Sequence, residues 1–170
     1  MHLINPAPPL TMFVDLNSAF ATTEQQAHPS LRGRPMGVTN RIHNYACIIA
    51  CSYEAKALGI KVGMRMNEAL KLCPNFVLLE TDPAKYHHVY RKILKIMQSY
   101  TPNVAMKSID EGVMKFDTII NLDRSLSDIG YEIKRRVRSE IGNHMSINVG
   151  IGTNQFLAKQ AAGWHKPDGL

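Results

Sequence analysis

The sequence predicts a protein of the α+β class. Short apolar runs, which are typical of strands, alternate with longer segments whose apolar residues recur at helical spacing. Outside residues 27–82, the predicted order is strand, helix, long helix, strand, strand, helix, strand, helix. This order contains the βαββαβ pattern of a ferredoxin-like domain, with residues 27–82 inserted after the first helix as a small α/β lobe.

The first strand and helix are marked by an intruding acid and by helix-capping residues. Residues 12–16 form an apolar run, interrupted by Asp15, that predicts a buried strand. Asn17 and Ser18 are residue types that cap helices, and residues 19–26 follow as a predicted helix. An unpaired acid buried in a strand costs several kcal/mol, so Asp15 is expected to have a partner.

The insertion consists of short elements separated by breakers and polar residues. Glycine and proline interrupt the chain at residues 29–35, and residues 40–44 predict a polar loop. The predicted strands cover residues 36–39, 47–51 and 76–80, and the predicted helices cover residues 53–58 and 67–72.

The remaining elements complete the predicted sheet. Residues 83–100 predict a long helix with four apolar residues on one face: Val89, Ile93, Ile96 and Met97. Strands are predicted at 104–106, 112–116 and 146–152, helices at 127–141 and 154–163, and a turn at 166–169. The basic run at residues 134–138 is interpreted as a solvated helix face.

Composition favours a globular protein and is compatible with a polyanionic partner, although many basic proteins have no such partner. Hydrophobic residues make up 45% and charged residues 20% of the chain, which excludes wholesale disorder. The net charge of +6 and the pI near 9.3 suit nucleic acid or a triphosphate.

The cysteines and the N-terminus favour a cytoplasmic protein. Cys47, Cys51 and Cys73 lack paired zinc-site spacings, and their apolar neighbours predict small buried residues in a reducing compartment. No apolar run approaches the ~18–20 residues of a membrane span, and the N-terminus lacks the pattern of a signal peptide. We therefore expect a cytoplasmic location and no membrane partner.

Three acidic residues are expected to meet at one end of the sheet. In a βαββαβ sheet the first and third strands are central, antiparallel neighbours. Asp15 near the end of the first strand would then lie beside Asp110 and Glu111 at the entry to the third strand. Asp110 or Glu111 taken singly has the alternative of a solvated turn residue, whereas Asp15 lies within an apolar run, where an unpaired acid would be costly.

Such a group of carboxylates predicts a magnesium site. Carboxylates that lie close together repel each other unless cations neutralise them, and Mg²⁺ prefers oxygen ligands. Two Mg²⁺ ions about 3.5–4 Å apart can activate a hydroxyl group and stabilise a leaving pyrophosphate, which suits phosphoryl transfer.

Four motifs resemble those of the Y-family translesion DNA polymerases, in the usual order. They are FVDLNSAFA at 13–21, ACSYEAK at 50–56, SIDE at 108–111, and NVGIG at 148–152 followed by FLAK at 156–159. The resemblance runs from about residue 12 to 170, and several separate motifs in order make it specific.

The resemblance implies roles for individual residues. Asp15, Asp110 and Glu111 would bind two Mg²⁺ ions, with the Leu16 carbonyl as a further ligand. Phe20 would be the steric gate that collides with a ribose 2′-OH; core packing is its alternative.

Further residues match those that bind the deoxynucleoside triphosphate in this family. They are Tyr53, Lys56 and Lys159, and for the two lysines a solvated side chain is the alternative. The backbone amides of Ser18 and Ala19, at the first helix's N-terminus, could also bind phosphate.

By resemblance, residues 1–26 and 83–170 would be the palm and residues 27–82 the fingers. The family catalyses template-directed DNA synthesis past lesions, which implies primer–template DNA as a partner. A sliding clamp would be a further partner through regions that this chain lacks.

The chain also departs from the family. Ala50 stands where a hydroxyl often contacts phosphate, Ala19 and Val113 stand where aromatic residues are common, and Lys115 replaces a frequent acid. The chain stops where the family's thumb begins, so it is either a fragment or naturally short. A non-catalytic nucleotide-binding or interaction domain is the alternative function. A nucleotide cyclase is a third option, against which the motifs at Tyr53 and Lys159 argue.

Overall fold

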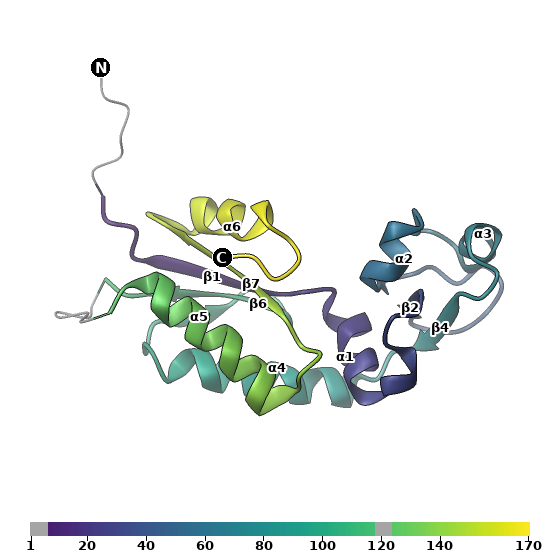
Figure 1. Cartoon of the computed structure of the whole chain (residues 1–170), viewed down its shortest axis with the longest axis horizontal. Helices are drawn as coiled ribbons and strands as arrows, with labels where there is room; N and C mark the ends of the chain where they lie inside the picture. Colours follow the sequence, from purple (N-terminus) through teal and green to yellow (C-terminus); the bar gives the residue numbers. More distant parts are fainter. Residues whose placement is uncertain (1–6, 118–123) are drawn as a thin grey trace, which may run out of the picture. The chain divides into compact units, whose positions relative to one another are not determined.

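The computed structural model of the chain describes residues 7–117 and 124–170 (Figure 1). It has two compact units. The first comprises Met1–Asn17 and Val89–Leu170, and the second comprises Ser18–His88. The palm and fingers boundaries predicted from the sequence remain a prediction. They were drawn from the order of predicted strands and helices, whereas the two compact units are defined by which residues contact one another.

The first unit is built on a four-stranded antiparallel sheet in the order β5-β6-β1-β7. Its strands are β1 (Thr11–Leu16), β5 (Val104–Met106), β6 (Glu111–Lys115) and β7 (Ile147–Gly152). Its helical elements are α5 (Leu126–Arg136), η2 (Val137–Ile141), α6 (Gln155–Trp164) and the part of α4 (Pro83–Gln98) from Val89 onward. This order, with β1 and β6 as antiparallel neighbours, confirms the ferredoxin-like prediction.

Helices cover both faces of this sheet (Figure 1). On one face, α4 and α5 approach so closely that an added Cβ would lie 3.0 Å from Met97 at Gly112 and 3.2 Å from Val149 at Gly130. On the other face, α6 packs on Phe13 and Val113 through Ala158 and Ala162. The predicted apolar face of the long helix is confirmed, since its four residues are all buried.

The second unit contains a three-stranded mixed sheet in the order β3-β2-β4. Its strands are β2 (Met36–Thr39), β3 (Ala50–Cys51) and β4 (Val77–Glu80). Its helices are α1 (Ala19–Ala27), η1 (Pro29–Leu31), α2 (Tyr53–Ala57), α3 (Met66–Leu72) and the start of α4. Its core includes Ile48, Ile60 and Phe76. An α/β lobe was therefore correctly predicted for this part of the chain.

Some predicted elements differ from the structure. The segment predicted as a strand over residues 47–51 is extended only at Ala50–Cys51, and Cys47 forms a single bridge with Arg65. Cys47 is exposed, so its predicted burial was wrong, whereas Cys51 and Cys73 are buried as expected. Ala46 and Ile48 take the inward positions on either side of Cys47.

The basic helix predicted over residues 127–141 changes its winding along its length. It is α-helical to Arg136 and continues as the wider turn of η2, where the Gly142 N–H donates to the Val137 carbonyl at 3.2 Å. Among the described residues, no helix combines the length and apolar character that crossing a membrane requires.

Candidate active site

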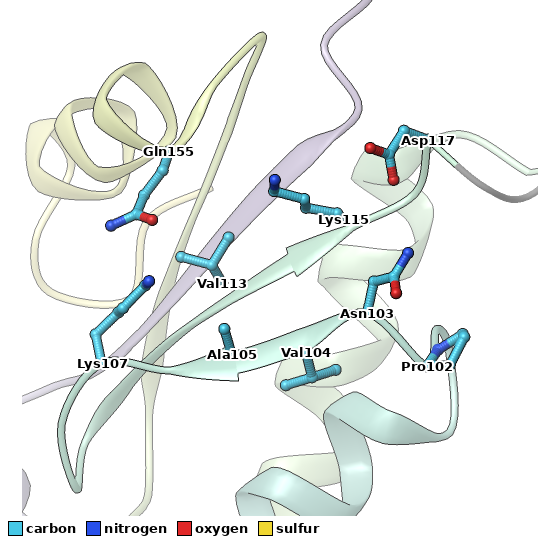
Figure 2. Close-up of a pocket in the computed structure, with 9 residues that line it drawn as sticks. All are labelled: Pro102, Asn103, Val104, Ala105, Lys107, Val113, Lys115, Asp117 and Gln155. Atoms are coloured by element: carbon cyan, nitrogen blue, oxygen red, sulfur yellow. The ribbon is translucent and has the colours of Figure 1, made fainter.

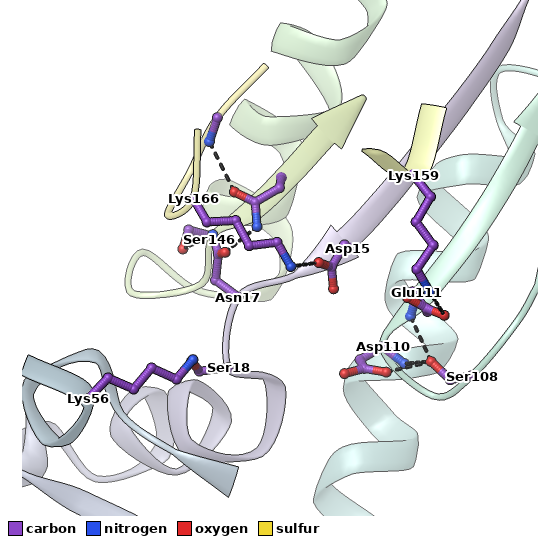
Figure 3. A network of polar contacts seen from close by, with 12 residues as sticks. Asp15, Asn17, Ser18, Lys56, Ser108, Asp110, Glu111, Ser146, Lys159 and Lys166 are labelled. Carbon is purple, nitrogen blue, oxygen red and sulfur yellow. Dashed lines mark hydrogen bonds and ion pairs between the residues drawn. The ribbon is translucent and has the colours of Figure 1, made fainter. Parts of the chain in front are cut away.

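The predicted acidic residues lie on adjacent strands of the first unit (Figure 3). Asp15 in β1 is paired in register with Glu111 at the start of β6. The Leu16 N–H donates to the Asp110 carbonyl at 2.9 Å, which extends the ladder by one step beyond β6. Three residues far apart along the chain thus share one end of the sheet, which we call the acidic edge (Asp15, Asp110 and Glu111).

A serine orders the turn that carries two of these acids. The Ser108 hydroxyl accepts the backbone N–H groups of Asp110 at 3.3 Å and Glu111 at 3.2 Å. It also donates to the Asp110 carboxylate at 2.5 Å. The Lys107 N–H closes the hairpin on the Glu111 carbonyl at 2.9 Å. Ser108, which the sequence interpretation gave no role of its own, therefore orients Asp110.

Two lysines neutralise the acidic edge. Lys159 in α6 donates to both carboxylate oxygens of Glu111 at 2.9 Å, and its ammonium lies 5.2 Å from the centre of the Phe13 ring. Lys166 donates to the carboxylate of Asp15. Both lysine side chains are about half exposed, so each ion pair stabilises the fold by only about 0–1 kcal/mol. The lysines can therefore exchange for another cation at little cost.

Burial and neighbouring charges act against each other at Asp15. Burial raises the pKa of its carboxyl above the ordinary value, and the contact with Lys166 lowers it again. The charges of Asp110 and Glu111 raise this pKa further. The net result is a raised pKa, because burial and the two neighbouring carboxylates outweigh the contact with Lys166.

The acidic edge fits hard divalent cations in its chemistry. Its donors are carboxylate oxygens, which Mg²⁺ prefers, and they come from neighbouring strand positions. In the side-chain conformations of residues 7–117 and 124–170, however, no group of three or more His, Cys, Asp and Glu side chains is arranged to hold a metal ion. In these conformations Asp15 and Glu111 are paired with lysines, and Asp110 accepts from Ser108.

A buried polar network positions the segment that carries Lys166 (Figure 3). The amide of Asn148 donates to Asn17, and the amide of Asn17 donates to the Ser146 hydroxyl at 3.0 Å. The Gly169 N–H donates to the Asn148 side chain at 3.1 Å. The sequence interpretation saw only a turn at residues 166–169, since no local signal indicates that Lys166 reaches an acid 151 positions earlier.

Lys134 contributes to the same anchoring and corrects the interpretation of a solvated helix face. Its side chain is buried, and its ammonium donates to the backbone carbonyls of Asp168 and Gly169. Arg138 forms an ion pair with Asp168 as well. The basic run therefore faces partly inward and fixes the C-terminal turn against α5 and η2.

In the second unit, three of the predicted triphosphate-binding residues lie together. Lys56 donates to the Ser18 hydroxyl at 2.7 Å, and its ammonium lies 4.5 Å from the centre of the Tyr53 ring (Figure 3). Ser18 precedes α1 in the left-handed conformation, with φ 45°, and its side chain does not cap the helix. Its hydroxyl is thus directed to the lysine, while Ala19 is buried in the first turn of the helix.

Phe20 packs on a second aromatic ring of the same unit. The rings of Phe20 and Tyr86 are stacked, with their centres 4.3 Å apart. The Tyr86 hydroxyl donates to the buried carboxylate of Glu24 at 2.9 Å, and Lys85 donates to the same carboxylate at 2.6 Å. Burial raises the pKa of Tyr86, so it stays a neutral donor. This network holds the Phe20 ring in place.

The structure thus collects the predicted residues into two groups. Asp15, Leu16, Asp110, Glu111 and Lys159 belong to the first unit, and Ser18, Ala19, Phe20, Tyr53 and Lys56 belong to the second.

Comparisons with known proteins identify the family. A model described as the impB/mucB/samB family matches residues 14–163, which is most of the chain. The chain belongs to this family. The predicted resemblance to Y-family DNA polymerases is confirmed by the relatives that follow.

A DNA polymerase IV of Ralstonia nicotianae is 38% identical over 156 residues, covering 92% of this chain and 43% of the relative. The crystal structure of DinB from Sulfolobus solfataricus matches with a TM-score of 0.85 and 25% identity. An insertion ternary complex of Dbh DNA polymerase matches with a TM-score of 0.84 and 25% identity. Each of these two structural matches covers 94% of this chain and 47% of the solved chain. The chain therefore spans less than half the length of these proteins.

Proposed function

We propose that this chain is the nucleotide-incorporating part of a DNA polymerase. Its reaction would be attack of a primer 3′-OH on the α-phosphate of a deoxynucleoside triphosphate, with release of pyrophosphate. The observation that carries the proposal is the pairing of Asp15 with Glu111 across β1 and β6, with Asp110 one step beyond. The names of the relatives, DNA polymerase IV and Dbh DNA polymerase, support this reaction. A cytoplasmic location remains a prediction from the sequence.

In this proposal, Asp15, Asp110 and Glu111 hold two Mg²⁺ ions, with the Leu16 carbonyl as an additional ligand. When bound, the ions would activate the attacking hydroxyl and stabilise charge on the leaving pyrophosphate. Ser108 keeps the Asp110 carboxylate oriented, and Lys159 and Lys166 balance the carboxylates of the free protein.

The second group of residues would bind the nucleotide. The ammonium of Lys56, with the Tyr53 ring beside it and the Ser18 hydroxyl as its partner, offers charge and hydrogen bonds to phosphate oxygens. Lys159 would exchange its contact with Glu111 for a contact with phosphate.

The test is primer extension with Mg²⁺. Asp110→Asn keeps the shape of the side chain but removes its charge, and it should lower the rate of extension roughly 100-fold or more, because metal sites are sensitive even to changes in outer-shell partners. The matched control is Asp82→Asn in the second unit, which removes the charge of a half-exposed carboxylate while asparagine can still accept the Lys85 N–H, and it should leave the rate unchanged. Extension that survives in Asp110→Asn would remove the acidic edge from the mechanism.

A non-catalytic nucleotide-binding or interaction domain is the second candidate. It is favoured by the absence, among the described residues, of a side-chain group arranged to hold a metal ion. Calorimetric titration with a deoxynucleoside triphosphate separates the two. The polymerase proposal expects binding that strengthens with Mg²⁺ and weakens in Asp110→Asn, whereas an interaction domain shows neither dependence.

A further inference from the structure

Two basic helices lie side by side on the outer side of the first unit: α4 from Val89 onward, and α5 with its continuation η2 (Figure 1). Arg136 donates to the Ser99 hydroxyl at 2.6 Å, and its guanidinium lies 5.5 Å from the centre of the Tyr100 ring. Lys92 donates to the Glu140 carbonyl at 2.9 Å. These contacts fix the two helices against each other.

The acidic edge and these helices belong to opposite faces of the sheet. On the side of the acidic edge, a groove of about 520 Å³ is lined by residues of β5, β6 and the start of α6 (Figure 2). Its Lys115 shares a face with Glu111, because the two are alternate residues of β6. The groove, which Lys107 also borders, therefore belongs with the candidate active site. The outer side of α4 and α5 is separated from both by the sheet.

The two helices concentrate positive charge. The part of α4 in the first unit carries three basic residues and no acidic residue, and α5 with η2 carries four basic and three acidic residues. Their net charge is therefore +4, compared with +6 for the whole chain. Two of the three acids are already paired, Glu132 with Arg124 and Glu140 with Arg136. They leave the outward-facing cations without matching acids.

Three of these cations are available to a ligand. Arg91 and Lys95 lie one turn apart on the side of α4 opposite its buried residues, and Arg135 lies on the corresponding side of α5. All three are exposed, and within residues 7–117 and 124–170 none of them forms a hydrogen bond or an ion pair. Tyr131 lies one turn before Arg135 and is 51% exposed. We call these four residues the basic surface.

The basic surface lacks the apolar centre of a protein interface. Such interfaces derive most of their binding energy from a few large side chains that become buried together. Among the large apolar side chains that the described part of the chain exposes, only Tyr131 lies on these helices. A nucleic-acid strand needs no apolar centre, because its phosphates bind separate cations and its unpaired bases stack on single aromatic rings. The surface therefore favours a strand over an acidic protein segment.

We propose that the basic surface binds single-stranded nucleic acid, at a site separate from the acidic edge. Arg91, Lys95 and Arg135 contact phosphates, and Tyr131 stacks on a base. Contacts of this kind hold a strand without reading its sequence. The inference goes beyond the proposed polymerase reaction and does not depend on it.

The first experiment measures binding of oligodeoxythymidylate to the whole chain by fluorescence anisotropy over a series of salt concentrations. Each phosphate contact to a single strand contributes about 0.7 to the slope of log K against log salt. Arg91→Ala and Arg135→Ala should each reduce the magnitude of this slope by about that amount. Arg135→Lys keeps the charge and should keep the slope. Lys71→Ala, which removes an exposed lysine of α3 in the second unit, is the matched control and should leave the slope unchanged.

The second experiment tests stacking. Tyr131→Ala should weaken binding of the oligonucleotide by about fivefold or more, whereas Tyr131→Phe keeps the ring and should keep the affinity. An abasic strand with the same number of phosphates should bind the unchanged chain and Tyr131→Ala equally. Oligouridylate of the same length identifies the natural strand, since the tighter of the two oligonucleotides points to DNA or RNA.

Several outcomes would overturn the basic surface. They are the absence of oligonucleotide binding at low ionic strength, unchanged slopes in both arginine variants, and an equal loss in Lys71→Ala. Binding of oligoglutamate that depends on Arg91 and Arg135, while oligonucleotide binding does not, would assign the surface to an acidic protein segment instead.

A further variant separates this inference from the catalytic proposal. Asp110→Asn should lose primer extension and keep the binding of oligodeoxythymidylate with its dependence on Arg91 and Arg135. Extension that persists in Asp110→Asn would refute the catalytic role of the acidic edge and leave the basic surface standing. Arginine variants that bind the oligonucleotide as the unchanged chain does would refute the basic surface and leave the polymerase proposal standing.

Discussion

At the scale of the residue, the central feature is how the acidic edge balances its charge. Asp15 is partly buried beside two other carboxylates, and Lys166 and Lys159 neutralise the edge from the C-terminal segment. Because the lysine side chains of these ion pairs are about half exposed, the pairs contribute little stability and can be displaced. Under the proposed function, the two lysines would give way to divalent ions at this edge.

Phe20 supports a prediction about sugar selection. If its ring excludes the ribose 2′-OH, Phe20→Ala should raise the ratio of ribonucleotide to deoxynucleotide incorporation by roughly tenfold or more, since removal of a collision worth about 1.4 kcal/mol is enough. Single-nucleotide incorporation kinetics with matched triphosphates measure this ratio. Tyr86→Phe keeps the stacked ring and should keep the discrimination. An unchanged ratio in Phe20→Ala would leave Phe20 as a packing residue.

At the scale of the element, the position of Lys159 depends on how closely α6 approaches β7. An added Cβ at Gly150 would lie 2.0 Å from the Ala158 carbonyl oxygen and 2.2 Å from the Ala162 nitrogen. No side chain fits in that space, so the glycine permits helix and strand to meet. Lys159 follows Ala158 directly and is thereby held over the Phe13 ring and beside Glu111.

Gly150→Ala should therefore be strongly destabilising. The new methyl group meets backbone atoms that cannot rotate away, so the free energy of unfolding should fall by about 3 kcal/mol or more. Gly163→Ala, in the same helix, is the control: no heavy atom lies within 4 Å of its added Cβ, and alanine should stabilise the helix by up to about 1 kcal/mol. Urea denaturation measures both changes. Equal effects of the two substitutions would contradict the packing argument.

At the scale of the whole molecule, the chain combines two units with separate cores and separate groups of candidate site residues. It covers 43% of a curated relative and 47% of each of the two solved chains described above. The activity of a full-length polymerase is therefore a proposal for this chain.

Magnesium should stabilise the chain if the acidic edge binds it. A ligand at one hundred times its Kd contributes about 2.7 kcal/mol, which corresponds to a rise in Tm of about 5–10 °C for a chain of this size. Thermal denaturation with and without Mg²⁺ measures the shift. Asp110→Asn should abolish it and Asp82→Asn should not. The same shift in Asp110→Asn would place the bound ion elsewhere.

The sequence by itself determined the order of elements, the ferredoxin-like topology and the end of the sheet where Asp15, Asp110 and Glu111 lie. These features follow from local apolar periodicity and from strand order, both of which can be recognised in the sequence alone. Periodicity could not show that Cys47 faces outward, because its neighbours are apolar on both sides.

Only the tertiary structure decided which side chains meet across long separations. Lys166 reaches Asp15, Lys134 is buried under the C-terminal turn, and Lys107 and Lys115 border one groove. A lysine looks the same in a sequence whether it is solvated or paired. Its partner is set by the packing of distant elements, whose geometry no local pattern encodes.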